Sequence, residues 1–205
     1  MIHKYVSILL LFSLSISTYP TISLSKNENN SNQQALQAFL TFEKQIYDLL
    51  DTAMGSLNEL GEKPGMKNLY KNVWSAKQKF FDTSLAFTKL KIPPTLPDDI
   101  KASLKDIKDS FSTGFDALGA SMGYFLQYID NGNPILFDRF VEKREEGVAF
   151  IDGGLTSLAS VKMQLSSIEF KLKPNTWIVG KRYLNELQNI TPSGNRSIQS
   201  QSEGN

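Results

Sequence analysis

Apolar residues recur every three or four positions through most of residues 36–190, and this helical period limits the fold more than any other feature of the sequence. No segment alternates with a period of two for long enough to indicate a strand. Turn residues interrupt the period at Gly61, Pro64, Pro93-Pro94 and 130–134. The pattern therefore predicts helices over about 36–60, 69–87, 95–129 and 137–172, and a shorter helix over 177–190.

Short connections between long helices favour antiparallel neighbours. We therefore expect an all-α fold, an up-down-up-down antiparallel four-helix bundle with long third and fourth helices and a short C-terminal helix. The third helix has a coiled-coil-like seam in which one four-residue insertion interrupts the heptads. That seam consists of Ile100, Leu104, Ile107, Phe111, Phe115, Leu118, Met122, Phe125 and Ile129. The fourth helix is either continuous through Gly153-Gly154 or kinked there.

The first 25 residues have the order of a secretory signal peptide. Lys4 precedes an apolar run over 6–16, and Ser23 and Ser25 supply small residues before a cleavage site at Lys26. The alternative is an uncleaved anchor, but a spanning helix needs about 20 apolar residues. We expect a secreted or extracytoplasmic protein with no stable membrane span after cleavage. The domain organisation that we expect is a signal peptide at 1–25, a flexible leader at 26–33, a helical domain at 34–190 and a disordered tail at 191–205.

The residue types that are missing exclude most catalytic chemistry. The chain has no cysteine, and its one histidine, His3, lies in the predicted signal peptide. Without them, catalytic triads, the usual zinc sites and the di-iron sites of helical bundles cannot be built. Lys4 is the one basic residue of 1–25, so the remaining chain is neutral and nucleic-acid binding is disfavoured. We expect no cofactor, no metal ion and no enzymatic activity.

Six glycines interrupt the third and fourth helices, although each costs up to about 1 kcal/mol relative to alanine. Pairing the two helices about Gly132 places Gly119 opposite Gly147. Three explanations remain open: close backbone approach, a hinge at Gly153-Gly154, or a cavity ringed by phenylalanines that holds an apolar ligand. The residues of this candidate site are Phe111, Gly114, Phe115, Gly119, Gly147, Phe150, Gly153 and Gly154.

Arg144 belongs to the same candidate site, because it occupies a seam position between Val141 and Val148. Three environments suit an arginine there: its guanidinium extends past the apolar seam to solvent, it meets a buried acid, or it binds an anionic ligand. Trp74 and Trp177 are expected to be packing anchors. Trp177, Ile178 and Val179 form an alternative candidate, an exposed contact for a partner.

These observations indicate a non-catalytic helical protein that acts as a binding or interaction module in the cell envelope or the extracellular space. The partner is an unidentified protein or surface, and the sequence indicates no oligomeric state. The alternative is a carrier of a small apolar ligand held between the third and fourth helices.

Overall fold

A computed structural model describes residues 26–58, 66–166 and 175–190, and it contains no strand within those ranges. The all-α prediction is confirmed. The described helices are α1 (Lys26–Gly55), α2 (Met66–Lys89), α3 (Asp98–Asn131), α4 (Pro134–Leu165) and α5 (Asn175–Glu186), with a final 3₁₀ turn, η2 (Leu187–Asn189). The predicted signal peptide at 1–25 and the predicted tail at 191–205 lie outside the described residues.

The turn between α3 and α4 forms as its residues predict. Gly132 adopts φ of +68°, and its N–H donates to the Tyr128 carbonyl at 2.8 Å, which closes α3. The Asn133 side chain accepts a hydrogen bond from the Ile135 N–H at 3.0 Å, and Pro134 occupies the first position of α4. At the other end of α3, Pro97 is the N-cap residue, and the helix begins at Asp98, slightly later than the expected start near residue 95.

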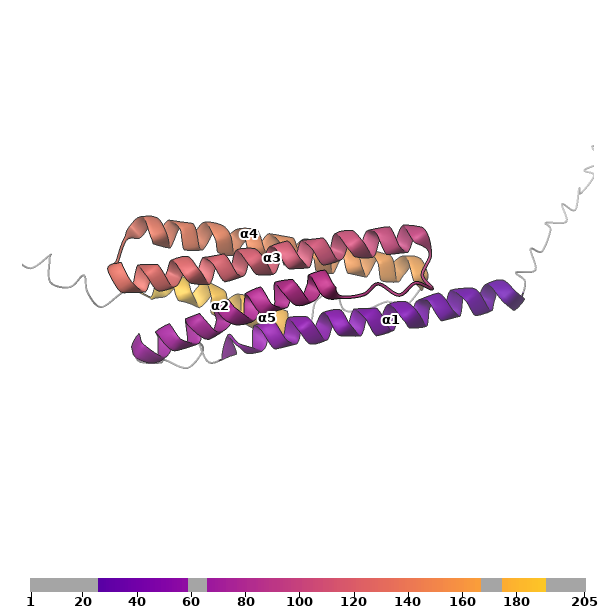
Figure 1. The fold of residues 1–205 in the computed structure, drawn as a ribbon, viewed down its shortest axis with the longest axis horizontal. Coiled ribbons are helices and arrows are strands. Elements are labelled where there is room, and N and C mark those ends of the chain that lie inside the picture. Colours follow the sequence, from indigo (N-terminus) through magenta and orange to yellow (C-terminus); the bar gives the residue numbers. More distant parts are fainter. Residues whose placement is uncertain (1–25, 59–65, 167–174, 191–205) are drawn as a thin grey trace, which may run out of the picture.

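α3 lies between α2 and α4 and packs closely against both (Figure 1). Ring contacts set the antiparallel pairing with α4, where Phe125 packs against Phe140 with ring centroids 4.7 Å apart. On the α2 side, Phe87 stacks on Phe111 at 4.9 Å. Aromatic pairs of this kind add about 0.5–1.5 kcal/mol beyond the area they bury, so α3 is the central element of the core.

The predicted seam of α3 is the centre of that core. Eight of its nine residues, from Ile100 to Phe125, are buried, while Ile129 is partly buried. Each fully buried side chain of this size contributes about 1.5–3 kcal/mol relative to an exposed one. α4 is continuous from Pro134 to Leu165 and passes through Gly153-Gly154 without interruption.

α1 begins at Lys26, so residues 26–33, expected to be a flexible leader, belong to a helix. The start of α1 projects beyond the ends of α3 and α4 (Figure 1). Adding residues to an existing helix costs little once the first turns have formed. The part of α1 whose apolar residues are buried, from Ala35 to Met54, supplies those turns, and the polar residues before it extend them.

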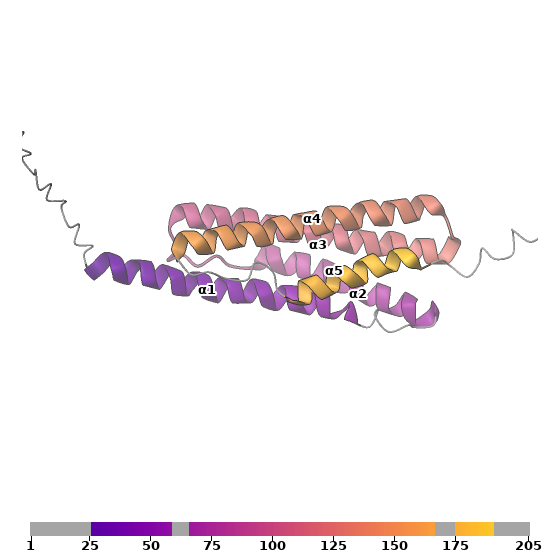
Figure 2. The ribbon, with the colours of Figure 1, turned by 180° about the vertical axis from the view of Figure 1, so that it is seen from behind.

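α5 lies against the end of α1 and beside α4, as Figure 2 shows from behind. It runs parallel to α1, because Thr176 contacts Asp51 and Gly180 contacts Met54. It runs antiparallel to α4, since Trp177 meets Asp152 and Leu184 meets Arg144. None of the described helices combines the length and apolar character that crossing a membrane requires.

Candidate functional site

Gly114 of α3 and Gly147 of α4 face each other across the α3–α4 interface. A Cβ atom on Gly147 would lie 2.7 Å from the Gly114 carbonyl oxygen, and one on Gly114 would lie 3.0 Å from the Gly147 oxygen. Contacts of that length are repulsive, so glycine at both positions is what permits this separation of the helices. Close backbone approach accounts for these two glycines.

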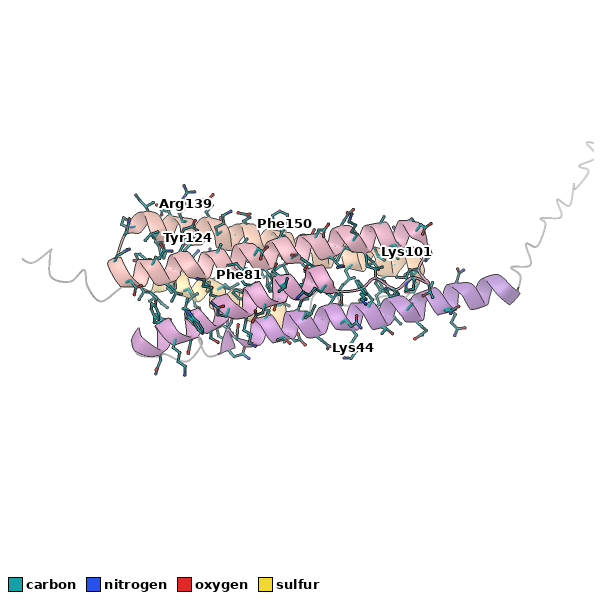
Figure 3. All side chains as sticks on the ribbon, viewed as in Figure 1. Lys44, Phe81, Lys101, Tyr124, Arg139 and Phe150 are labelled. Carbon is teal, nitrogen blue, oxygen red and sulfur yellow. The ribbon has the colours of Figure 1, made fainter. Side chains whose placement is uncertain are left out.

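The expected pairing of Gly119 with Gly147 is wrong. Gly119 faces α2, where a Cβ atom would lie 2.8 Å from the ring of Phe81, while Leu118 packs against Gly147 (Figure 3 labels Phe81). The position of Gly119 along α3 relative to Gly147 was predicted correctly to within one residue, because Leu118 contacts Gly147. Successive helical residues point about 100° apart, however, so a one-residue difference turns Gly119 toward the other neighbour.

The three phenylalanines of the expected apolar cavity do not surround a common space. Phe111 and Phe115 point toward α2 and stack on Phe87. The edge of the Phe111 ring packs against Gly154, where a Cβ atom would lie 3.2 Å from it. Phe150, by contrast, is 40% exposed. The Phe87 ring therefore occupies the space next to Phe111 and Phe115.

A groove of about 250 Å³ does lie between α3 and α4, but polar residues line most of it. Its lining residues are Ser103, Asp106, Ile107 and Ser110 from α3 and Ser157, Ser160, Val161 and Gln164 from α4. Ligand pockets are typically larger and mainly apolar. This groove does not have the chemistry of an apolar carrier site.

Arg144 is buried beneath α5, with 4% of its surface exposed, so its guanidinium does not extend to solvent. The group donates to the Leu184 carbonyl at 3.4 Å and lies 5.6 Å from the centre of the Phe140 ring. With its amide oxygen turned toward Arg144, Gln188 accepts two more hydrogen bonds. Burial lowers the pKa of Arg144, against the opposite effect of the Glu145 carboxylate, which is 3.6 Å away.

These contacts give Arg144 a structural role at the C-terminal end of α5. Cations are favourable at helix C-termini, where carbonyl groups lack partners within the helix. Among the described residues, Arg144 pairs with the carboxylate of Glu145, which is exposed. The buried partners of its guanidinium are therefore backbone and amide oxygens, and not the buried acid that the sequence suggested.

Trp177 is fully buried, and its role as a packing anchor is confirmed. Its indole N–H donates to the Asp152 carboxylate at 2.9 Å, and Lys181 bonds the other oxygen of that carboxylate at 2.8 Å. Trp177 is therefore unavailable to a partner. Ile178 and Val179 are exposed and remain available.

A buried ion pair joins α1 to α4. Lys162 donates to the Glu43 carboxylate at 2.8 Å, and the Tyr47 hydroxyl donates to the same carboxylate at 3.2 Å. Burial, followed by the charge of Glu43, raises the pKa of Tyr47 above its ordinary value.

The raised pKa of Tyr47 predicts loss of stability at high pH. The unfolded chain loses the tyrosine proton near pH 10 while the folded protein retains it, so stability is complete below that pH and falls as pH rises above it. One proton gives a slope of at most about 1.4 kcal/mol per pH unit. Tyr47→Phe should show a shallower decline in urea unfolding free energy between about pH 9.5 and 11. Parallel declines in the two proteins would contradict this expectation.

α2 carries a second apolar face that the sequence interpretation missed. Tyr70, Trp74, Phe81 and Leu85 are exposed on one side of the helix, and we call these four residues the α2 stripe. Trp74 and Leu85 are each 52% exposed, so the expectation that Trp74 is a packing anchor is wrong.

A signal for the stripe was present in the sequence. Three stripe residues directly follow a core residue, namely Leu69, Val73 or Phe80, and all three of these are buried. Because successive residues point about 100° apart on a helix, each adjacent apolar pair places a second side chain beside the core face and widens the apolar surface.

Comparison of the chain with protein-family models, with curated proteins and with solved structures finds no match in any of the three, so the proposals below depend on the geometry of this chain alone.

Proposed function

We propose that this protein is an exported, non-catalytic binding module, an up-down-up-down bundle of α1–α4 that contacts a protein partner through the α2 stripe. The observation that carries the proposal is the alignment of the four exposed residues. Single exposed apolar side chains are ordinary on protein surfaces, whereas contiguous ones mark contact sites. A neighbouring face of α2 supplies the core, and Phe81 packs over Gly119 of α3. Tyr70, Trp74 and Leu85 are not among the described apolar residues that pack against the core, so packing within the described chain leaves these three unexplained.

The composition of the stripe also supports a binding role. Three of its four residues are aromatic, and tyrosine and tryptophan are enriched among the residues that dominate binding energy at protein interfaces. Export is proposed from the signal-like residues 1–25 alone.

The alternative function, a carrier of an apolar ligand between α3 and α4, has less support. Phe87 stacks on both Phe111 and Phe115, and the groove between α3 and α4 is lined mainly by serine, aspartate and glutamine. No described contact favours the carrier over the binding module.

Site-specific photo-crosslinking tests the proposed function. A benzophenone amino acid at position 74, introduced in the protein's own source, should give a discrete adduct. Excess wild-type protein should compete for that adduct, and excess Trp74→Ser/Leu85→Ser protein should not. The matched control is the same group at Met163 of α4, which is 66% exposed and lies outside the stripe. Equal labelling from positions 74 and 163, or none from either, would contradict the proposal.

A further inference from the structure

We infer that the α2 stripe receives an amphipathic helix of a partner protein, and that this helix carries an acidic residue in the middle of its apolar seam, opposite Lys77. The inference rests on the proposed function and specifies its partner. It follows from the spacing of the stripe, the small residues beside it and the charges around it.

The spacing of the stripe matches that of a helix-packing seam. Its residues, from Tyr70 to Leu85, are separated by four, seven and four positions. Steps of three and four produce this pattern when one position between Trp74 and Phe81 is occupied by another residue type, although the span is one residue longer than two heptads. Lys77 and Gln78 both fit that position by spacing, and Lys77 is the one whose side chain lies along α3, next to Gly123. At about 1.5 Å per residue the seam is roughly 22 Å long, which suits a partner segment of about 15 residues.

The face of α3 next to the stripe carries small side chains, so a second helix can approach it closely. Phe81 lies over Gly119, and the Lys77 side chain passes Gly123 with its Cε 3.7 Å from where a Cβ atom would be. Further along, the hydroxyls of Ser84 and Ser112 lie 3.0 Å apart. The large residues of α2 form one wall of a shallow groove, and the small residues of α3 form its floor. This arrangement resembles the grooves that bind amphipathic helices.

The central cation specifies the charge of the partner. Within the described parts of the chain, Lys77 forms no ion pair. A charged residue at one seam position determines which helix can bind and in which register, because the facing helix must supply a group of opposite charge. A carboxylate opposite Lys77 does so. Lys71 and Lys89, which are exposed on α2, add to the preference for an acidic helix.

The same charges disfavour two other occupants. A second copy related by a two-fold axis at the middle of the stripe would place Lys77 against its own equivalent, which is repulsive. A flat anionic membrane would also meet Asp82 of α2 and Asp116 of α3, both exposed, whereas a helix with its acidic residue opposite Lys77 need not place another acid next to them. Asp116 is one helical turn from both Ser112 and Gly119, so it lies beside the groove.

A charge-swap experiment tests the inference. The probe is a fluorescein-labelled synthetic helix of about 18 residues, with leucine at its seam positions and glutamate at the central one. A second probe has lysine there instead. The wild-type protein should bind the glutamate helix at least about tenfold more tightly than the lysine helix by fluorescence anisotropy. Lys77→Glu should reverse the preference.

Lys79→Glu is the matched control, because Lys79 is exposed on α2 away from the stripe and the substitution makes the same change in net charge. It should leave the preference unchanged. Trp74 emission should shift to shorter wavelength as the glutamate helix binds, since its indole then leaves water.

Three results would overturn the inference. They are equal affinity for the two helices, sedimentation as a dimer that Leu85→Ser dissolves, and binding to phosphatidylserine vesicles without binding to either helix. If position 74 still gives a competed adduct with a protein of the source, only the helical, acidic nature of the partner is wrong. If that adduct is absent as well, the proposed function itself is wrong.

Discussion

Replacing Gly147 with alanine is expected to destabilise the protein by about 2–3 kcal/mol. The added Cβ would lie 2.7 Å from the Gly114 carbonyl oxygen and 2.8 Å from Leu118, so α3 and α4 must separate. Overpacking typically costs about 1–3 kcal/mol and occasionally more, and we expect about 3–4 kcal/mol here because a backbone oxygen cannot rotate away as a side chain does. The helix-propensity gain of about 1 kcal/mol offsets part of that cost.

Gly153→Ala is the matched control for this prediction. It lies on the same helix, but a Cβ there would meet nothing within 4 Å. The control should therefore stabilise the protein by up to about 1 kcal/mol through helix propensity alone. Thermal unfolding followed by circular dichroism should lower Tm by about 5–10 °C for Gly147→Ala and raise it by a few degrees for Gly153→Ala. A Tm for Gly147→Ala at or above the wild-type value would show that the helices are not held at this separation.

The sequence predicted the helices and the α3 seam because both depend on one period. The period assigns each residue a height along its helix and a direction around it. Buried positions such as Ile107 and Phe125 therefore appear where they are expected. The turn at Gly132 and Asn133 was equally predictable, because its residue types have strong local preferences.

The candidate site was less predictable, because it depends on which neighbour each face meets. Gly119 was placed at the correct height, but whether it faces α4 or α2 depends on the rotation of α3. Arg144 also fits a seam, and what covers it is α5, a helix forty residues further along the chain. Hydrophobic periodicity gives no information about such long-range placement.

The tryptophans illustrate the same limit. Both follow the pattern of packing anchors, yet Trp74 is half exposed and Trp177 is fully buried. The difference comes from what lies opposite each residue. Trp177 has Asp152 of α4 within hydrogen-bond distance, whereas the side of α2 that carries Trp74 has no helix over it among the described elements.

Replacing Trp177 with alanine is expected to release α5 from the rest of the protein. Truncation of a buried tryptophan costs about 3–5 kcal/mol. α5 has 12 residues, and an isolated helix of that length is marginal in water. Some of the remaining contacts, such as Lys181 with Asp152 and Arg144 with Leu184, are polar and gain water when they separate, and Leu184 and Leu187 are smaller apolar anchors than the tryptophan. The loss should therefore appear as local opening of α5 and not as unfolding of α3 and α4.

Amide hydrogen exchange measures this opening directly. In Trp177→Ala, protection should fall over 175–190 and stay near wild type in α3, where the core residues Phe111 and Phe125 lie. Trp74→Ala is the control, since the same truncation at a half-exposed position should leave the protection of α5 intact. Trp177→Phe should give an intermediate loss, because the ring volume is largely kept and the hydrogen bond to Asp152 is removed. Unchanged protection of α5 in Trp177→Ala would contradict this expectation, because it would mean that Leu184, Leu187 and the polar contacts hold the helix in place without the tryptophan.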